Sequence, residues 1–454
     1  MINISKKARL ITTYLSLLLL LNSCSKGSTE QVVTPIITYT LIVTVSSGGI
    51  VDQARGIYNE NTEEVITATA NVDFYFSGWS GDASGTDNPL TVLMNRNKSI
   101  VANFVASDDD MDGVINALDQ CRLTPEDESV NDQGCASFEI DTDGDGVNDI
   151  YDQDNTTRQG APVDQNGVML NPVIIGANGF TIVANAWAIP GDVGELNGTV
   201  FTVVSEDELR VKITNNEDIT SVCTSRVTNM SALFEGANTF NQDISHWDTS
   251  AVTNMRSMFS NASVFNQAIG NWDTSNVTDT KAMFSNAEAF DQDIHAWDTS
   301  NIIDASSMFN FALLFNQDLG RWDITSVTNL TRMFYRAESF NQDIGNWDTS
   351  GVTSTSGLFW YALVFNQNIS SWNVSDVTDM SLMFYGAEEF NQNIGSWNTS
   401  NVTDMGWMFL NAFAFNQDLS GWCVSNVTSE NETFSENSAL TEVNLPIWGT
   451  CPNN

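Results

Sequence analysis

Residues 252–276 read VTNMRSMFSNASVFNQAIGNWDTSN, and close variants of this 25-residue stretch follow one another through much of the 454-residue chain. Three residue types in it recur at a fixed interval of 25. They occupy Phe240, Phe265, Phe290, Phe315, Phe340, Phe365, Phe390 and Phe415; Gln242, Gln267, Gln292, Gln317, Gln342, Gln367, Gln392 and Gln417; and Trp247, Trp272, Trp297, Trp322, Trp347, Trp372, Trp397 and Trp422. Such a period is typical of stacked units, because one unit alone cannot bury its apolar side chains.

The apolar residues inside one unit predict its local structure. They fall mostly three or four positions apart, at Met255, Met258, Phe259, Ala262 and Phe265. This spacing is typical of the apolar face of a helix, which Thr253 or Asn254 would cap. Residues 269–277 suit a turn and a short strand. The sequence therefore predicts an α/β solenoid, leucine-rich-repeat-like, with one short strand and one short helix per coil and coils about 4.8 Å apart where strands pair.

Three side-chain rows run along the expected stack. We expect the recurring Asn and Gln residues to form hydrogen-bonded ladders from coil to coil. The Trp row either fills the interior or forms an exposed platform for glycans, and one Trp per coil at a fixed position favours the interior. The residue after Trp is usually acidic, as in Asp248, Asp273, Asp298, Asp323 and Asp348. We expect each to make a turn hydrogen bond rather than to bind a cation.

The repeats resemble the BspA-like, 25/26-residue repeats of bacterial surface proteins, which are often grouped with leucine-rich repeats. The resemblance covers residues 227–436 and rests on the pattern Phe-Asn-Gln-Asp-Ile-x-x-Trp-Asp-Thr-Ser. Asp291, Ala268, Asn373 and Asn398 depart from it. The resemblance implies an adhesion or interaction role and identifies no partner.

Segments on either side of the repeats are expected to cap the stack. Residues 169–226 hold a linker and an N-terminal cap, in which a strand over 199–204 precedes a short helix opened by the Ser205 to Glu208 capping box. Residues 437–454 form the C-terminal cap, which we expect a Cys423–Cys451 disulfide to clamp. Cys223 is left without an assigned partner.

Residues 107–168 carry the most specific chemical pattern of the chain. Two loops 33 residues apart place oxygen ligands at alternating positions. The candidate ligands are Asp108, Asp110, Asp112, the carbonyl of Val114, Asn116 and Asp119 in the first loop, and Asp141, Asp143, Asp145, the carbonyl of Val147, Asp149 and Asp152 in the second. Alternate carboxylates converge on a hard cation and repel each other strongly without one. The sequence therefore predicts that both loops bind Ca²⁺.

These loops resemble thrombospondin type 3 repeats, a resemblance that extends to Thr124-Pro125 and to residues 130–135. It implies a calcium-wrapped stalk with little core of its own. Position 12 is Asp rather than Glu and no amphipathic helices flank the loops, so a calcium sensor is not expected. Cys121 and Cys135 align with Asp154 and Val168 of the second copy. Because both cysteines are absent there together, we expect a Cys121–Cys135 disulfide.

Residues 35–106 read as a small all-β module. Segments such as 39–45, 64–70 and 99–104 are rich in β-branched residues and are separated by glycine turns. The run from Phe76 to Asp82, with the later Asn88-Pro89-Leu90, resembles the internalin B-type bacterial repeat, a spacer or binding unit of surface proteins. Trp79 is either a ligand platform or a core residue, and we expect the core. Ser80 has no histidine in the module to activate it.

The first residues resemble the signal peptide of a bacterial lipoprotein. A basic start, a short apolar run and the tetrapeptide Leu21-Asn22-Ser23-Cys24 match the lipobox. The resemblance implies cleavage after residue 23, lipidation of Cys24 and a polar tether over residues 24–34. The alternative is an ordinary cysteine after an ordinary signal. We expect an outer-membrane protein that is lipid-anchored and faces the cell exterior.

Charge and missing motifs exclude several functions. A formal net charge of −40 repels nucleic acid. The chain has two histidines, no glycine-rich phosphate loop and no nucleophile with a nearby base, so we expect no catalytic residues and no enzyme. The predicted function is a cell-surface adhesion or protein-interaction module on a calcium-stabilised stalk. A glycan-binding lipoprotein for polysaccharide capture and a structural envelope protein are the alternatives.

Overall fold

The computed structural model describes residues 34–427 and 433–452 of the chain. The described residues form two compact units, which divide between Ile140 and Asp141 and are described separately. The division falls between the two acidic loops. Among the described residues, no helix is long and apolar enough to cross a membrane.

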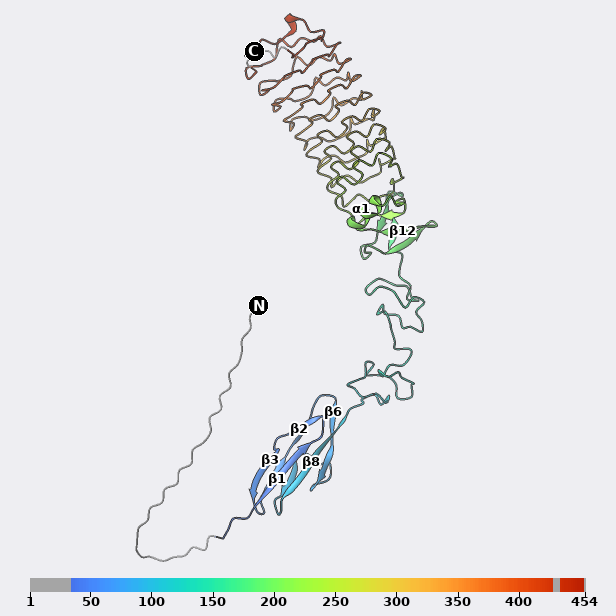
Figure 1. The fold of residues 1–454 in the computed structure, drawn as a ribbon, viewed down its shortest axis with the longest axis vertical. Coiled ribbons are helices and arrows are strands. Elements are labelled where there is room, and N and C mark those ends of the chain that lie inside the picture. Colours follow the sequence, from blue (N-terminus) through green and yellow to red (C-terminus); the bar gives the residue numbers. More distant parts are fainter. Residues whose placement is uncertain (1–33, 428–432, 453–454) are drawn as a thin grey trace, which may run out of the picture. The chain divides into compact units, whose positions relative to one another are not determined.

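The first unit begins with a small β module. Its strands are β1 (Thr38–Val45), β2 (Gly49–Val51), β3 (Arg55–Asn59), β4 (Glu63–Ile66), β5 (Ala68–Ala70), β6 (Phe74–Gly81), β7 (Leu90–Leu93) and β8 (Lys98–Ala106). The main sheet has the order β3-β1-β8-β6, while β2 pairs with β5 and β4 with β7 (Figure 1). Trp79 is buried in the core and donates its indole N–H to the carbonyl of Asp87 at 2.7 Å. Its expected core role is confirmed.

Residues 107–172 contain no regular helix or strand, although all of them lie in the described part of the chain. They are turns and bends with two isolated antiparallel bridges, Val130 with Ala136 and Val163 with Met169. Hydrogen bonds from backbone N–H groups to Asp and Asn side chains shape this segment.

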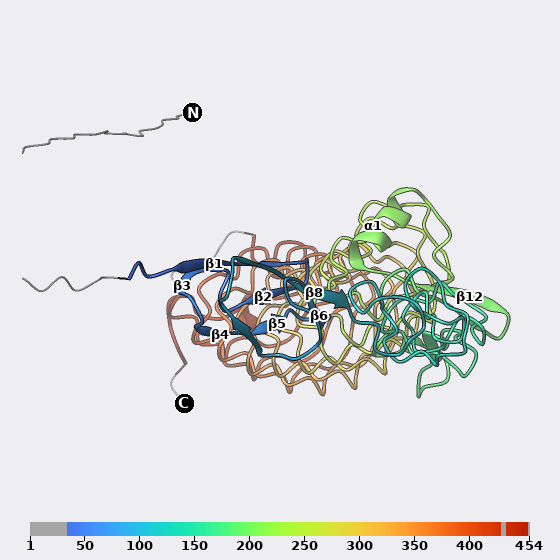
Figure 2. The same ribbon diagram turned by 90° about the horizontal axis from the view of Figure 1, so that it is seen from below.

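The cap of the repeats is a small mixed element. It consists of β9 (Val173–Ile175), β10 (Ile182–Ala184), β11 (Val193–Leu196), β12 (Thr199–Val203), α1 (Glu206–Thr214) and β13 (Val222–Cys223). The predicted strand is confirmed as β12, and the predicted helix is confirmed as α1, with both halves of the capping box between Ser205 and Glu208 present. Arg210 of α1 donates to the carbonyls of Asn229 and Ser231, which places the helix on the first coil (Figure 2).

The repeats form 25-residue coils that stack directly on one another, but the prediction of an α/β solenoid was wrong. Among the described residues, α1 is the only α-helix, and none of the coils contains one. From Asn229 to Asp404, each coil is made of tight turns and forms one isolated parallel β-bridge with the next coil rather than a full strand. The bridged residues are Asn229, Asn254, Asp279, Asp304, Asn329, Ser354, Asp379 and Asp404.

Hydrogen bonds between coils explain why no helix forms. In the segment expected to be helical, Met255, Ser257 and Phe259 donate their N–H groups to carbonyls of the next coil, at 2.8–2.9 Å. Ser257 and Asn261 adopt positive φ angles of 54° and 60°, which an α-helix does not allow. The spacing of three and four residues therefore arises from successive tight turns rather than from a helix.

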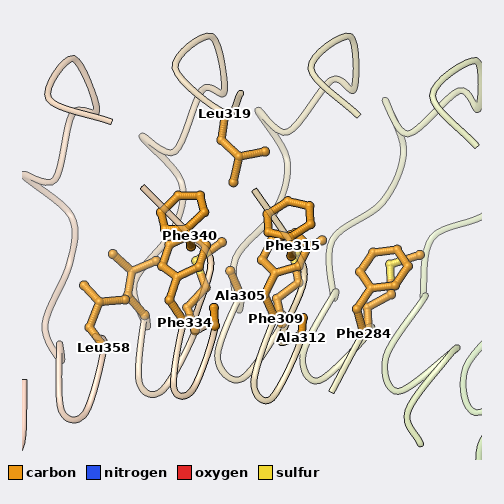
Figure 3. Packing of buried hydrophobic residues seen from close by; sticks show 14 of the residues in the cluster. Phe284, Ala305, Phe309, Ala312, Phe315, Leu319, Phe334, Phe340 and Leu358 are labelled. Carbon is orange, nitrogen blue, oxygen red and sulfur yellow. The ribbon is translucent and has the colours of Figure 1, made fainter. Parts of the chain in front are cut away.

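The interior of the stack consists of continuous rows of rings. Phe259 stacks on Phe284 with ring centroids 5.5 Å apart. Within the Trp row, four pairs stack with ring centroids 6.1–6.4 Å apart: Trp247–Trp272, Trp297–Trp322, Trp347–Trp372 and Trp397–Trp422. Figure 3 shows the phenylalanines of successive coils packed in register. The repeated Trp residues are at most 5% exposed, and Trp272 donates its indole N–H to the carbonyl of Ile244. The Trp row is thus buried, and it offers no exposed platform for glycans.

The expected amide ladder is present, and in it one side-chain oxygen accepts two hydrogen bonds from the next coil. Asn341 uses its side-chain Oδ1 to accept the backbone N–H of Asn366 and the side-chain amide of Gln367, at 2.9 and 3.0 Å. Asp291 does the same for the next coil, because this position uses only an acceptor oxygen. The Asp row makes turn hydrogen bonds as expected, and Asp273 accepts both the N–H and the hydroxyl of Ser275.

Candidate functional site

Three carboxylates of the first acidic loop lie close together. Oxygen atoms of Asp108, Asp110 and Asp112 all lie within 4.8 Å of one another. Asp108 accepts hydrogen bonds from the N–H groups of Met111 at 2.9 Å and Gly113 at 3.1 Å. Gly113 has a φ of +98°, which a residue without Cβ adopts easily. The loop backbone thus holds the predicted ligands at positions 1, 3 and 5 together.

Several carboxylate oxygens of this loop lack a donor. One oxygen each of Asp110, Asp112 and Asp119 is buried and has no hydrogen-bond partner among the described residues. Asp119, at position 12, is only 7% exposed, and its other oxygen accepts the N–H of Cys121 at 2.7 Å. A buried carboxylate oxygen without donor or cation is costly. Converging hard oxygens are the ligands that Ca²⁺ prefers, so these residues fit the ion.

The second acidic loop repeats the arrangement. Oxygens of Asp141, Asp143 and Asp145 lie within 4.8 Å of one another, and one oxygen each of Asp145 and Asp152 is buried without a partner in the described chain. The N–H of Val147, which donates to Asp145 at 2.8 Å, lowers the pKa of this carboxyl. Burial and the neighbouring carboxylates, led by Asp143, outweigh that bond and raise the pKa overall. A bound cation would remove this repulsion.

The predicted ligands at position 9 also make hydrogen bonds that hold the loops together. Asn116 uses its side-chain oxygen to accept the N–H of Asp109 at 2.9 Å. Asp149 accepts the N–H and the hydroxyl of Thr142, one on each carboxylate oxygen, at 2.7 and 2.6 Å. At position 7, the N–H of Val114 donates to the carboxylate at position 5 at 2.8 Å. The structure therefore brings together the acids at positions 1, 3 and 5, whereas position 9 closes the loop.

Two glycines complete the site and were not among the predicted site residues. A Cβ added to Gly134 would lie 2.2 Å from an oxygen of Asp119, and one added to Gly167 would lie 1.9 Å from an oxygen of Asp152. Thr124 donates its hydroxyl to the carbonyl of Gly134 at 2.8 Å. This bond holds the backbone at Gly134 against the carboxylate of Asp119. The signal for this role was the recurrence of both glycines 33 residues apart.

Both expected disulfides are present. Cys121 and Cys135 are bonded with their Cα atoms 5.0 Å apart, and Cys423 is bonded to Cys451. Cys223 is a buried free thiol that contacts the carbonyl of Ile182 at 3.3 Å, and burial raises its pKa. Cys24, the predicted lipidation site, lies outside the described residues.

Comparison with protein families accounts for most of the chain. Residues 205–313, 267–359, 295–380 and 342–448 match the family described as Mycoplasma protein of unknown function, DUF285. Together these matches cover more than half of the 454 residues. The chain belongs to this family. The DUF285 repeats thus coincide with the stacked coils and include α1 of the cap.

A second family match concerns the N-terminal module. Residues 39–108 match the divergent InlB B-repeat domain, so the resemblance to internalin B-type repeats is confirmed. No curated protein and no solved structure matches the chain. Repeats of the InlB and DUF285 types suggest a surface protein-interaction role, without a specific function.

Proposed function

We propose that this DUF285 protein is a bacterial surface lipoprotein that acts as an adhesion or protein-interaction module. The observation that carries the proposal is the contrast between the interior and the exterior of the coil stack. Inside, the same Phe and Trp rows repeat in each coil. Nearer the surface, one position of the coil changes from unit to unit; Asn261 is exposed there, Asn286, Phe311, Arg336, Tyr361 and Asn411 are half-buried, and Gly386 is buried. A constant core with a varied surface is the organisation by which repeat proteins present binding faces.

The acidic loops support a second part of the proposal, that residues 107–168 bind Ca²⁺ and are stiffened by it. The main ligands would be the acids at positions 1, 3, 5 and 12 of each loop. Calorimetric titration of the purified chain with CaCl₂ should show binding that is lost in the double variant Asp112→Asn/Asp145→Asn. Asp132→Asn, outside the two clusters, is the matched control. Unchanged calcium binding in the double variant would contradict the assignment.

The anchor is the third part of the proposal. Lipid attached to Cys24 would hold the protein at the outer membrane, facing the exterior. Expression in a Gram-negative host should give a protein that partitions into detergent and is accessible to protease on intact cells. Cys24→Ser should move it to the aqueous phase. A Cys24→Ser variant that still partitions with detergent would exclude this anchor.

The interaction role is tested with the chain from Ser25 onward. Arrays of extracellular-matrix proteins, bacterial surface proteins and polysaccharides should be probed in calcium and in chelator. We expect saturable binding to a protein ligand. The buried Trp row removes the platform on which the glycan alternative relied. Binding to polysaccharide alone would replace the proposal with glycan capture, and silence on all probes would favour a structural envelope role.

A further inference from the structure

An aromatic and arginine cluster lies on one face of the middle coils. We call the side chains of Phe311, Tyr335, Trp360, Tyr361 and Tyr385 the aromatic face. All five are only partly buried. Tyr335 stacks on Trp360 at 4.2 Å, and Trp360 stacks on Tyr385 at 5.6 Å. The earlier coils hold Ser260 and Ser285 at the position of Tyr335 and Trp360. The cluster is therefore a local addition that the coil fold does not require.

Neighbouring residues are fitted to this cluster. A Cβ on Gly386 would lie 2.4 Å from the ring of Tyr361, and a Cβ on Gly357 would lie 3.2 Å from the side chain of Arg332. In both cases a glycine of one coil leaves space for a large side chain of the preceding coil. Because both glycines adopt positive φ angles, they also suit the backbone there.

The backbone at the aromatic face disfavours the residues that occupy it. Phe311 and Tyr361 have φ angles of 55° and 53°, in the left-handed region. Asn261, Asn286 and Asn411 hold the same coil position, and Asn tolerates this conformation better than an aromatic residue does. Aromatic residues are therefore kept here against a conformational cost, which points to a use outside the fold.

Two arginines give the face its charge. The guanidinium of Arg332 lies 5.7 Å from the centre of the Trp360 ring, and that of Arg336 lies 5.0 Å from Phe311 and 5.7 Å from Tyr361. Arg336 pairs with Glu338 at 3.4 Å, whereas the exposed Arg332 is in none of the salt bridges found among the described residues. Arg55 and Arg321 are also exposed and in none of these salt bridges, but of the three only Arg332 has a cation–π contact among the described residues.

The ring geometry distinguishes between possible ligands. Sugar rings stack on exposed faces of aromatic rings, but the central Trp360 is stacked against Tyr335 and Tyr385, and the guanidinium of Arg332 also lies over its ring. What remains for a ligand is ring edges, tyrosine hydroxyls and guanidinium N–H groups. Tyr, Trp and Arg on a rigid support are the residues that dominate protein–protein contacts.

On the basis of the proposed interaction function, we propose that the aromatic face docks an acidic segment of a partner protein. Carboxylates of the segment pair with Arg332 and Arg336, and its apolar side chains cover the exposed edges of Trp360 and its neighbours. The net negative charge of the rest of the chain repels an acidic partner elsewhere, so the local cations direct it to this face.

The test uses a triple variant in which each substituted residue is one that another coil carries at the equivalent position. Arg332→Ser, Trp360→Ser and Tyr361→Asn copy Ser307, Ser285 and Asn286. Arg321→Ser is the matched control, because Arg321 is exposed, lies on the same coils and has no aromatic contact among the described residues. Thermal melts should show that both variants retain the coil stack.

The probe is an array of short peptides in which Asp and Glu alternate with Leu, Phe or Tyr, beside Lys-substituted copies and polygalacturonate. The wild-type chain should bind the acidic peptides only, with affinity that falls as salt rises. The triple variant should bind roughly tenfold or more weakly, and the control should bind as the wild type does. Equal binding by the triple variant, preference for polygalacturonate, absence of acidic-peptide binding, or salt-dependent self-association through this face would each overturn the proposal.

Failure of this inference remains distinguishable from failure of the proposed function. If the triple variant still binds the protein ligands found on the arrays as the wild type does, the aromatic face is the wrong surface and the interaction role stands. If the wild type binds no protein at all, the interaction role itself is wrong.

Discussion

Asn316 receives two hydrogen bonds from the next coil on one oxygen. Its Oδ1 accepts the backbone N–H of Asn341 and the side-chain amide of Gln342, both at 2.9 Å. Asn316→Leu leaves both donors unpaired, whereas Gln342→Leu removes only one bond. Since each partly buried unpaired group costs about 1–3 kcal/mol, we expect losses in the free energy of unfolding of about 2 kcal/mol and about 1 kcal/mol, respectively. Urea denaturation measures both, and equal losses would contradict this geometry.

At the residue scale, the sequence predicted which side chains are buried, hydrogen-bonded or clustered better than it predicted the geometry of their contacts. The burial of Trp272 followed from its fixed interval, because a stack needs one large ring per coil. The amide ladder was also foreseen, but not that a single oxygen serves two donors, which explains the tolerance of Asp291. The alternating acids of the loops were predicted, while the role of Gly134 depends on a close backbone approach to Asp119, which the recurrence of the glycine at Gly167 signals only indirectly.

A whole coil is the element that this fold can gain or lose. Deleting residues 277–301 joins Asn276 to Ile302, which holds the coil position of Val277. The Phe and Trp rows and the bonds between coils stay in register, so we expect cooperative unfolding at a somewhat lower temperature. Deleting only residues 277–288 puts the rows out of register. Circular dichroism melts with dye binding should separate the two variants, and similar behaviour would exclude register as the organising constraint.

The secondary structure of the coil could not be predicted from apolar spacing. A helix and a series of tight turns both place apolar residues three or four apart, so Met258, Phe259 and Ala262 fit either. What decides is the direction of the N–H groups, which point to the next coil and form bonds that exist only once coils stack. One local signal was available, because Asn261, Asn286 and Asn411 share one coil position, and Asn tolerates the left-handed backbone seen there.

At the scale of the whole molecule, calcium should act on one part of the chain and leave another unchanged. Without a cation, the clustered carboxylates of residues 107–168 repel one another and keep buried oxygens unpaired. The coils are joined instead by amide, carbonyl and side-chain hydrogen bonds and by stacked rings. Chelation should therefore speed amide hydrogen exchange in residues 107–168 and leave exchange in residues 252–427 unchanged.

Hydrogen exchange with mass spectrometry, in calcium and in chelator, measures both regions in one sample. The variant Asp145→Asn/Asp152→Asn supplies the control, since it should weaken calcium binding in the second loop and raise exchange in residues 141–168 even when calcium is present. Magnesium at the same concentration should protect less, because it demands a stricter octahedral geometry than these loops offer. Faster exchange in the coils on chelation, or unchanged exchange in the acidic loops, would mean that calcium does not have the local role proposed for it.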